Sequence, residues 1–200
     1  MRRIMIAACL LLAGCGSDDQ RPAGALTFAP QVEPGDREWI LAAVEKVRPE
    51  ARRLIDDVDG MITVTTYRDP AGGAVGLARQ TGEQSYELAF NLAYLNGDRK
   101  LDRDATVAHE LAHVIDHALV EPELRDRLAA QLPSSGACLT AHTGDCTSPT
   151  ERFADTFAKW ALRGAVSVTG AGYGVTTPAS LEDWGAPLAE LAIAIEVASR

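Results

Sequence analysis

The segment 109–113, with the sequence HELAH, constrains the fold of this chain more than any other part of the sequence. Residues four apart lie on one face of an α-helix, so both imidazoles of His109 and His113 would reach one metal ion. Glu110 lies about 100° round the helix from His109. That position suits a general base acting on metal-activated water. The alternative is a helix whose histidines are only core or surface residues, and the intervening acid disfavours it.

A catalytic zinc ion needs a third protein ligand and leaves its fourth position to water. His117 continues the same helix, but it lies two turns from His109, about 12 Å along the axis, too far to share one ion easily. A downstream ERFADTFA sequence places Glu151 and Asp155 one turn apart. Glu151 can supply a carboxylate to the metal, and Asp155 can accept the spare N–H of a ligating histidine. Without HELAH, the two acids would be interpreted as solvent-exposed residues on the polar face of an amphipathic helix.

Composition and charge limit the classes of partner. The chain has 200 residues, of which 46% are apolar and 24% charged, as expected for one soluble domain with a core. Its formal net charge is -9, with 28 acidic against 19 basic residues. An acidic domain without a basic stripe is a poor candidate for nucleic-acid binding, so we expect none.

The first residues predict export. Arg2 and Arg3 precede an apolar stretch, 4–13, that is too short to span a bilayer as a stable anchor. The sequence LAGC that ends at Cys15 resembles the lipobox of bacterial lipoproteins, in which the signal is cleaved before a cysteine that becomes acylated. We therefore expect residues 1–14 to be a lipoprotein signal peptide and 15–35 a flexible tether; an ordinary secretory signal is the alternative.

Two cysteines remain after export and lipidation. Cys9 leaves with the signal, and Cys15 would carry the lipid, which leaves Cys138 and Cys146 in a loop-like stretch. An exported compartment is oxidising, so a disulfide between these two is expected. The alternatives are two free thiols or two metal ligands, although a CxxC-type zinc knuckle does not fit this spacing.

Hydrophobic periodicity predicts an α+β fold with a small three-stranded sheet, packed on the HELAH helix and the helices that follow it. Predicted helices cover about 36–57, 104–119, 149–162 and 187–199, with a short one after residue 122, and predicted strands cover 61–67, 74–79 and 86–92. The last strand alternates apolar and polar residues, which predicts a half-buried strand that could lie at the sheet edge. A peptide could add to it as a further strand.

HELAH followed by Glu-x-x-Ala-Asp-x-Phe-Ala resembles the gluzincin metallopeptidases. ERFADTFA alone resembles the second zinc motif of the CAAX-prenyl-protease-type enzymes, which span the membrane several times. The pairing of HELAHVID with SPTERFADTFA looks more like the soluble lethal-factor-like peptidase domains, and it covers about 84–163. This resemblance implies a minimal zincin-like metallopeptidase domain over 36–200.

The resemblance also implies a set of roles. His109, His113 and Glu151 would bind one Zn²⁺, Glu110 would be the base, and Asp155 would support a ligating histidine. Lethal-factor-like domains also have an aspartate at the position of Asp116. It falls within about 20° of His109 on the helical wheel. Asp116 could therefore orient a neighbouring group, or it could be structural.

The chain departs from that family in one respect. Lethal-factor-like enzymes have a tyrosine shortly before the ligand glutamate, and this sequence has none there. Such a residue stabilises the tetrahedral oxyanion. His142, in the loop between the two late cysteines, and Tyr173, in a glycine-rich segment, are the candidates to replace it.

The expected function is that of a zinc-dependent endopeptidase. It would be monomeric, act on peptides or proteins in the bacterial cell envelope, and touch the membrane only through its lipid. One alternative is a zinc-binding pseudoenzyme lipoprotein that acts as a binding module. Another is a structural envelope lipoprotein in which the HELAH helix only packs, and such a protein should purify without stoichiometric zinc.

Overall fold

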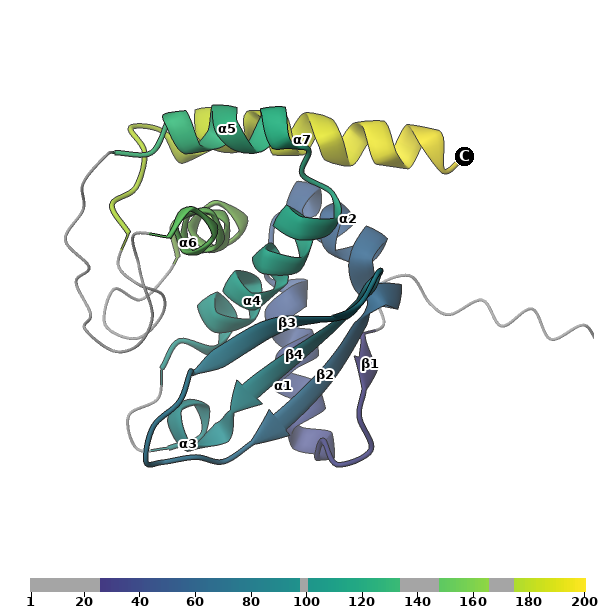
Figure 1. The fold of residues 1–200 in the computed structure, drawn as a ribbon, viewed down its shortest axis with the longest axis vertical. Helices are drawn as coiled ribbons and strands as arrows, with labels where there is room; N and C mark the ends of the chain where they lie inside the picture. The colour runs from purple at the N-terminus through teal and green to yellow at the C-terminus, as the bar shows by residue number, and fades with distance from the viewer. Residues whose placement is uncertain (1–25, 98–100, 134–147, 166–174) are drawn as a thin grey trace, which may run out of the picture.

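The computed structural model describes residues 26–97, 101–133, 148–165 and 175–200. These residues form an α+β fold in which helices pack on a mixed sheet (Figure 1), which confirms the predicted class. The sheet has four strands and not the three that were predicted. They are β1 (Thr27–Phe28), β2 (Ile62–Tyr67), β3 (Gly76–Gly82) and β4 (Ser85–Asn91).

The order of the strands is β1-β2-β4-β3. β1 and β4 both run parallel to β2, and β3 runs antiparallel to β4. β4 therefore lies inside the sheet, so its prediction as a possible edge strand is wrong, and β3 is the edge strand. Alternation could not reveal this, because period-two patterning reports which face is buried and not which neighbours a strand has.

The folded part begins earlier than predicted. Residues 26–35 were expected to belong to the tether, yet Leu26 and Val32 are buried and β1 pairs with β2. β1 is only two residues long and has no alternation of its own, so its sequence could not predict it. Its place in the sheet depends on the parallel neighbour, which lies more than thirty residues further along the chain.

The predicted helix 36–57 is two helices, α1 (Pro34–Glu45) and α2 (Pro49–Val58). Each begins with proline in its first turn, where a missing N–H costs nothing. Asp36 lies inside the first turn of α1. It accepts hydrogen bonds there from the Trp39 indole at 2.9 Å and from the Asn96 amide at 3.0 Å.

The remaining helices include two short ones that were not predicted, η1 (Asp59–Met61) and α3 (Leu92–Leu95). The other four follow the predicted order and are α4 (Arg103–Ala118), α5 (Pro122–Ala130), α6 (Pro149–Ala161) and α7 (Leu181–Ala198). α7 starts six residues before the predicted Pro187, because the Ser180 hydroxyl caps it by accepting from the Asp183 N–H. Among the described helices, none is long and apolar enough to cross a membrane.

The core lies between the sheet and the helices. α1 and α4 cover one face of the sheet, and α6 lies beyond α4, below α5 and α7 in the view of Figure 1. Around α6 the core is aromatic, with the rings of Phe157 and Trp160 5.5 Å apart and those of Phe153 and Trp184 5.8 Å apart. This packing fixes α6 against α4, which decides where Glu151 lies.

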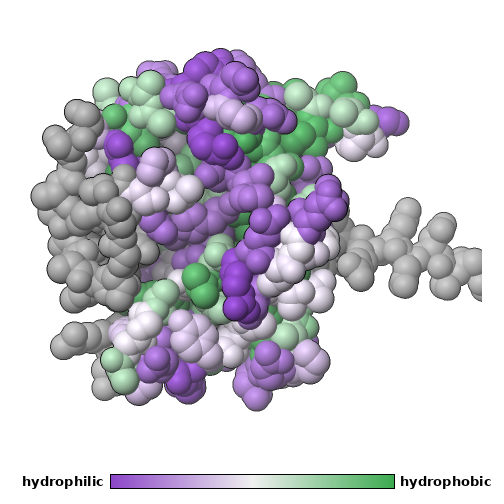
Figure 2. Space-filling model, viewed as in Figure 1, coloured by the Kyte–Doolittle hydropathy of each residue, from purple (hydrophilic) through white to green (hydrophobic). Residues whose placement is uncertain are grey.

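The opposite face of the sheet is polar, and most of the surface toward the viewer in Figure 2 is hydrophilic. Arg79 of the edge strand donates to Glu87, which also accepts from Thr65 at 2.9 Å. Green colour gathers along the C-terminal half of α7, where Ile193 and Val197 are exposed. The functional groups must therefore be sought on the helix side of the sheet.

Candidate metal centre

Three side chains from two helices converge beside the sheet edge. His109 and His113 lie one turn apart on α4, and Glu151 lies in the first turn of α6. The Nε2 atom of His109 lies 3.2 Å from Nε2 of His113 and 3.1 Å from Oε2 of Glu151. The third separation, from His113 Nε2 to Glu151 Oε2, is 3.5 Å. Two imidazole nitrogens and a carboxylate thus meet at one point.

These separations fit a zinc ion. Two atoms bound tetrahedrally to zinc at about 2.0–2.1 Å are about 3.3 Å apart, and the three observed distances bracket that value. The donor set of two histidines and one glutamate is also typical of catalytic zinc sites. His113 and Glu151 keep 19% and 22% of their side chains exposed, so the cluster opens on one side to solvent. The residues therefore could hold a metal ion and leave a position for water.

The charges of the metal-free cluster are strongly coupled. Burial disfavours the carboxylate of Glu151, but its hydrogen bonds with His109 and His113 outweigh burial and lower its pKa to about 2. Burial likewise lowers the pKa of His109, yet Glu151 and Glu110 together raise it above its ordinary value of 6.5. A proton on His109 thus replaces part of the charge that a cation would supply.

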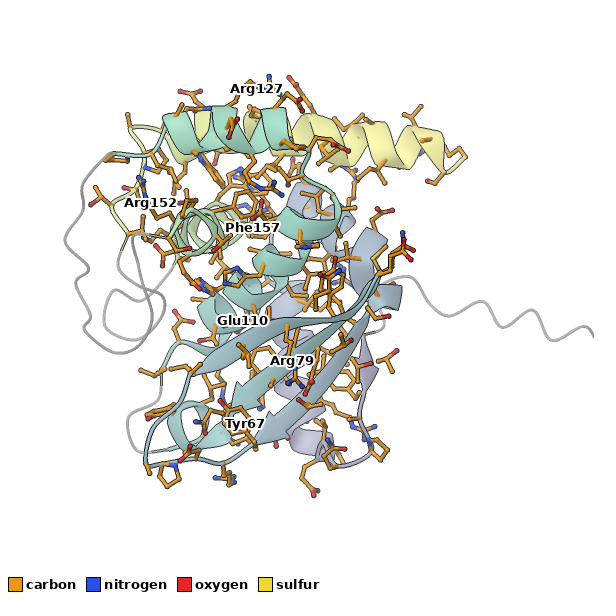
Figure 3. All side chains as sticks on the ribbon, in the orientation of Figure 1. Tyr67, Arg79, Glu110, Arg127, Arg152 and Phe157 are labelled. Atoms are coloured by element: carbon orange, nitrogen blue, oxygen red, sulfur yellow. The ribbon has the colours of Figure 1, made fainter. Side chains whose placement is uncertain are left out.

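Glu110 is placed between α4 and the edge strand (Figure 3). It is 6% exposed, and burial raises its pKa above the ordinary value of 4.5. The backbone N–H of Ala78 on β3 donates to its carboxylate. A β-carbon at Gly76 would come within 2.4 Å of Glu110 Oε1, so only glycine lets β3 lie this close. The edge strand therefore fixes the carboxylate beside the three candidate metal ligands.

Asp155 lies one turn after Glu151 and is buried. Its carboxylate accepts from Lys159 Nζ at 2.5 Å, and its charge contributes to the raised pKa of His109. That contribution places it near the cluster, as its predicted supporting role requires. Whether it orients a ligating histidine stays a prediction.

Asp116 has a different setting. Its carboxylate accepts from Arg125 Nε on α5 at 2.6 Å, and the same guanidinium donates to the backbone carbonyls of Asp116 and Val120. Arg125 thereby satisfies carbonyls at the C-terminal end of α4, where a cation is also favourable. Asp116 thus joins α5 to α4, which supports the structural alternative for this residue.

His117 is not part of the cluster, as the sequence predicted. Its Nδ1 lies 2.9 Å from the hydroxyl of Tyr86 on β4. Both residues line a groove of about 320 Å³ that also contains the metal cluster. One wall of the groove is β3, and its floor is α4. The lining residues are Ala74, Gly76, Leu77, Ala78, Arg79, Gln80, Tyr86, His109, Glu110, His113, Val114, Asp116, His117, Thr150 and Glu151.

Several predicted residues lie outside the described part of the chain. They are the two oxyanion candidates, His142 and Tyr173, the cysteines Cys138 and Cys146, and the lipidation site Cys15. Their roles and the disulfide stay predictions.

Sequence reasoning missed the wall of the groove. Gly76 and Ala78 reach Glu110 only because β3 is the edge strand, and Tyr86 reaches His117 only because β4 passes under α4. The glycine that opens β3 was a weak signal, since glycine inside a strand often marks a close approach.

Comparisons with protein-family models, with curated proteins and with solved structures found no match to this chain.

Proposed function

We propose that this chain is a zinc-dependent endopeptidase of the gluzincin type, with a minimal zincin-like catalytic domain. The observation that carries the proposal is the convergence of His109, His113 and Glu151 within metal-binding distance of one another. Glu110 lies beside them, held by the edge strand of the sheet. A helix that only packs would not need two imidazoles and a carboxylate at one point in an open groove, where they add nothing to the hydrophobic core.

When bound, a zinc ion would supply Lewis acidity, lowering the pKa of a water molecule and polarising a carbonyl group. The chain itself supplies the proton transfers. Glu110 is not one of the three ligands, so its carboxylate is available to take a proton from water and pass it to the leaving amine. Burial raises the pKa of Glu110 toward the range in which a carboxylate is an effective general base.

The groove can hold an extended peptide against β3. The strand order leaves β3 unpaired on the side away from β4, and this side carries the Ala78 N–H that reaches Glu110. A peptide added to this edge would be bound by its main chain, which suits a protease that accepts varied sequences. Peptide addition was predicted for the strand that is now β4, and we transfer it to β3.

The rival function is that of a pseudoenzyme that binds zinc and a peptide without cleaving it. A mixture-based peptide library, incubated with zinc-loaded protein and analysed by mass spectrometry, separates the two. We expect cleavage by the native protein and none after zinc is removed with a chelator. The Glu110→Gln variant should bind zinc equally and lose activity by about 10²–10⁴-fold, the usual contribution of a general base. Equal activity in that variant would contradict the proposal.

We further propose that the protein is exported and lipid-anchored through Cys15, which leaves a tether before the first described residue, Leu26. Labelling cells with an alkyne fatty acid should mark the native chain. A Cys15→Ser variant should be unlabelled and recovered outside the membrane fraction. Labelling that survives this substitution would contradict the assignment.

A further inference from the structure

The groove has a second polar end beyond the metal cluster. There, the hydroxyl of Tyr86 lies 2.9 Å from Nδ1 of His117, and the two rings meet edge to face with their centroids 5.7 Å apart. The tyrosine is buried, with 5% of its surface exposed, whereas the histidine is exposed to the groove. Neither side chain has a part in the proton transfers proposed above.

His117 lies on the same stripe of α4 as the catalytic groups. At 100° per residue, it falls about 20° from Glu110 and about 40° from His113, and it is one turn, about 6 Å, beyond His113. The β3 wall of the groove runs alongside this stripe of α4. At one end Gly76 lies on Glu110, and at the other Gln80 is paired with Tyr86. The groove thus leads from the metal cluster to the Tyr86–His117 pair.

The spacing matches an extended peptide. Side chains on one face of a strand recur every second residue, about 7 Å apart, close to the one-turn spacing of His113 and His117. β3 runs from the Glu110 end toward the His117 end. A peptide paired antiparallel with β3, the more stable pairing, would run the opposite way. Its residues near His117 would then precede the scissile bond.

The hydrogen bond of the pair selects the chemistry of the ligand. Burial raises the pKa of Tyr86, so its hydroxyl keeps its proton, and we assign this hydroxyl as the donor to Nδ1 of His117. The remaining nitrogen, Nε2, then carries the proton and is a donor. Two charged groups lie nearby, and each has an ion-pair partner: the Asp116 carboxylate is paired with Arg125, and the Arg79 guanidinium with Glu87. A hydrogen-bond acceptor on the peptide would therefore bind to Nε2 of His117.

We propose that Tyr86 and His117 form a specificity subsite for a carboxylate or carboxamide side chain two residues before the scissile bond. This inference rests on the proposed function, since it assumes a peptide whose carbonyl lies at the metal cluster. Tyr86 acts through His117, which makes it a positioning residue. His117 would contact the substrate.

Peptide hydroxamates test the subsite without any need for turnover, because the hydroxamate anchors the probe on zinc. The probes are acetyl-Asp-Ala-hydroxamate, acetyl-Asn-Ala-hydroxamate and acetyl-Ala-Ala-hydroxamate, and their dissociation constants are measured by calorimetry on the zinc-loaded full chain. We expect the Asp and Asn probes to bind at least about tenfold more tightly than the Ala probe, because each forms one additional hydrogen bond to a charged or polar partner.

Variants then assign the preference to the pair. His117→Ala should bring all three probes within about twofold of one another by weakening only the Asp and Asn probes. Tyr86→Phe should reduce the preference by a smaller factor, since it frees the histidine tautomer but keeps the donor. The matched controls are Tyr94→Phe, on α3 and outside the groove lining, and Arg127→Gln, on the exposed side of α5 (Figure 3), which should keep the native preference.

The outcomes separate this inference from the proposed function. Equal binding of the three probes to the native protein, or a preference that survives His117→Ala, would overturn the subsite and leave the zinc peptidase intact. A preference that appears only in reversed probes, whose hydroxamate precedes the variable residue, would overturn the direction of the peptide. If no hydroxamate binds the protein after zinc loading, the metal centre fails, and the subsite with it.

Discussion

The two faces of α6 have opposite chemistry. One face turns Glu151 and Asp155 toward α4, where two charged groups lie among histidines. The other face carries Phe153, Phe157 and Trp160, which pack on α7 and on each other. The aromatic face carries only side chains that pack. The acidic face carries two carboxylates, whose burial costs free energy unless a cation or a hydrogen-bond donor lies beside them.

Separate faces of one helix thus supply the packing and the candidate metal ligand. The aromatic face holds α6 in place, and the carboxylate of Glu151 reaches the histidines from the opposite face. Glycine permits a close approach on both sides. Gly76 of β3 lies on Glu110 of α4, beside the cluster that Glu151 completes, and Gly185 of α7 lies on Trp160 of the aromatic face. Substitutions on the two sides should therefore have separable effects.

The largest effect is expected from the acidic face. Glu151→Ala removes a ligand, so we expect zinc affinity to fall by more than about 100-fold, beyond the 10–100-fold typical of residues that only support a ligand. The free energy of unfolding measured without zinc should also fall, because the hydrogen bonds of Glu151 to His109 and His113 are lost. Competition with a fluorescent chelator measures the affinity. Unchanged affinity would show that the cluster is not the zinc site.

Gly76→Ala tests the wall of the groove. The added β-carbon would lie 2.4 Å from Glu110 Oε1, so the carboxylate must shift. Turnover should fall by about 10–100-fold, as displacement of a catalytic group by about 1 Å predicts. Zinc affinity and melting temperature should stay near native. Gly72→Ala is the matched control, because nothing lies within 4 Å of its β-carbon.

Gly185→Ala tests the aromatic face. Its β-carbon would lie 2.0 Å from Trp160 Nε1, and both residues are buried. Overpacking of this kind should lower the free energy of unfolding by about 1–3 kcal/mol, measured by urea denaturation. Zinc affinity of the folded variant should be native. A loss of zinc affinity comparable to that of Glu151→Ala would break the separation of the two faces.

The smallest expected effect is a pH dependence of the metal-free protein. The pKa values of His109 and Glu110 are raised on folding, so the stability they contribute is present at low pH and is lost as pH rises through the raised values. The pKa of Glu151 is lowered to about 2, so its effect on stability has the opposite sign: the stability it contributes is lost only as the pH falls below about 4.5. Melting temperature should therefore fall as pH rises above the ordinary pKa values of 4.5 for Glu110 and 6.5 for His109.

Zinc should reverse this trend, because it binds deprotonated ligands. The increase in melting temperature on adding zinc should grow over the same pH range. A constant increase would mean that the metal does not compete with protons at these residues.

Local patterns predicted the parts of the site that depend on helical periodicity. The one-turn spacing of His109 and His113 followed from HELAH, and the exclusion of His117 followed from its distance along the axis. Glu151 was predicted from the resemblance together with its motif, and α6 brings it to the histidines. The prolines that begin α1 and α2 were visible in the sequence, but the break between these helices was not predicted.

The parts that depend on strand order could not be predicted. β3 contains Arg79, Gln80 and two terminal glycines, and it has little of the branched or aromatic character that marks a strand. Its position at the edge is set by pairing with β4 after a tight turn. The wall on Glu110 and the Tyr86–His117 pair both follow from that position. Local sequence patterns therefore predicted the three residues that converge, but not which strand lies beside them.

The most direct test of the account is anomalous scattering from crystals of zinc-loaded protein, recorded on both sides of the zinc absorption edge. We expect one strong peak per chain, about 2.0–2.2 Å from Nε2 of His109, Nε2 of His113 and a carboxylate oxygen of Glu151. Absence of a peak there, or a peak at His117 or at Cys138 and Cys146, would contradict it.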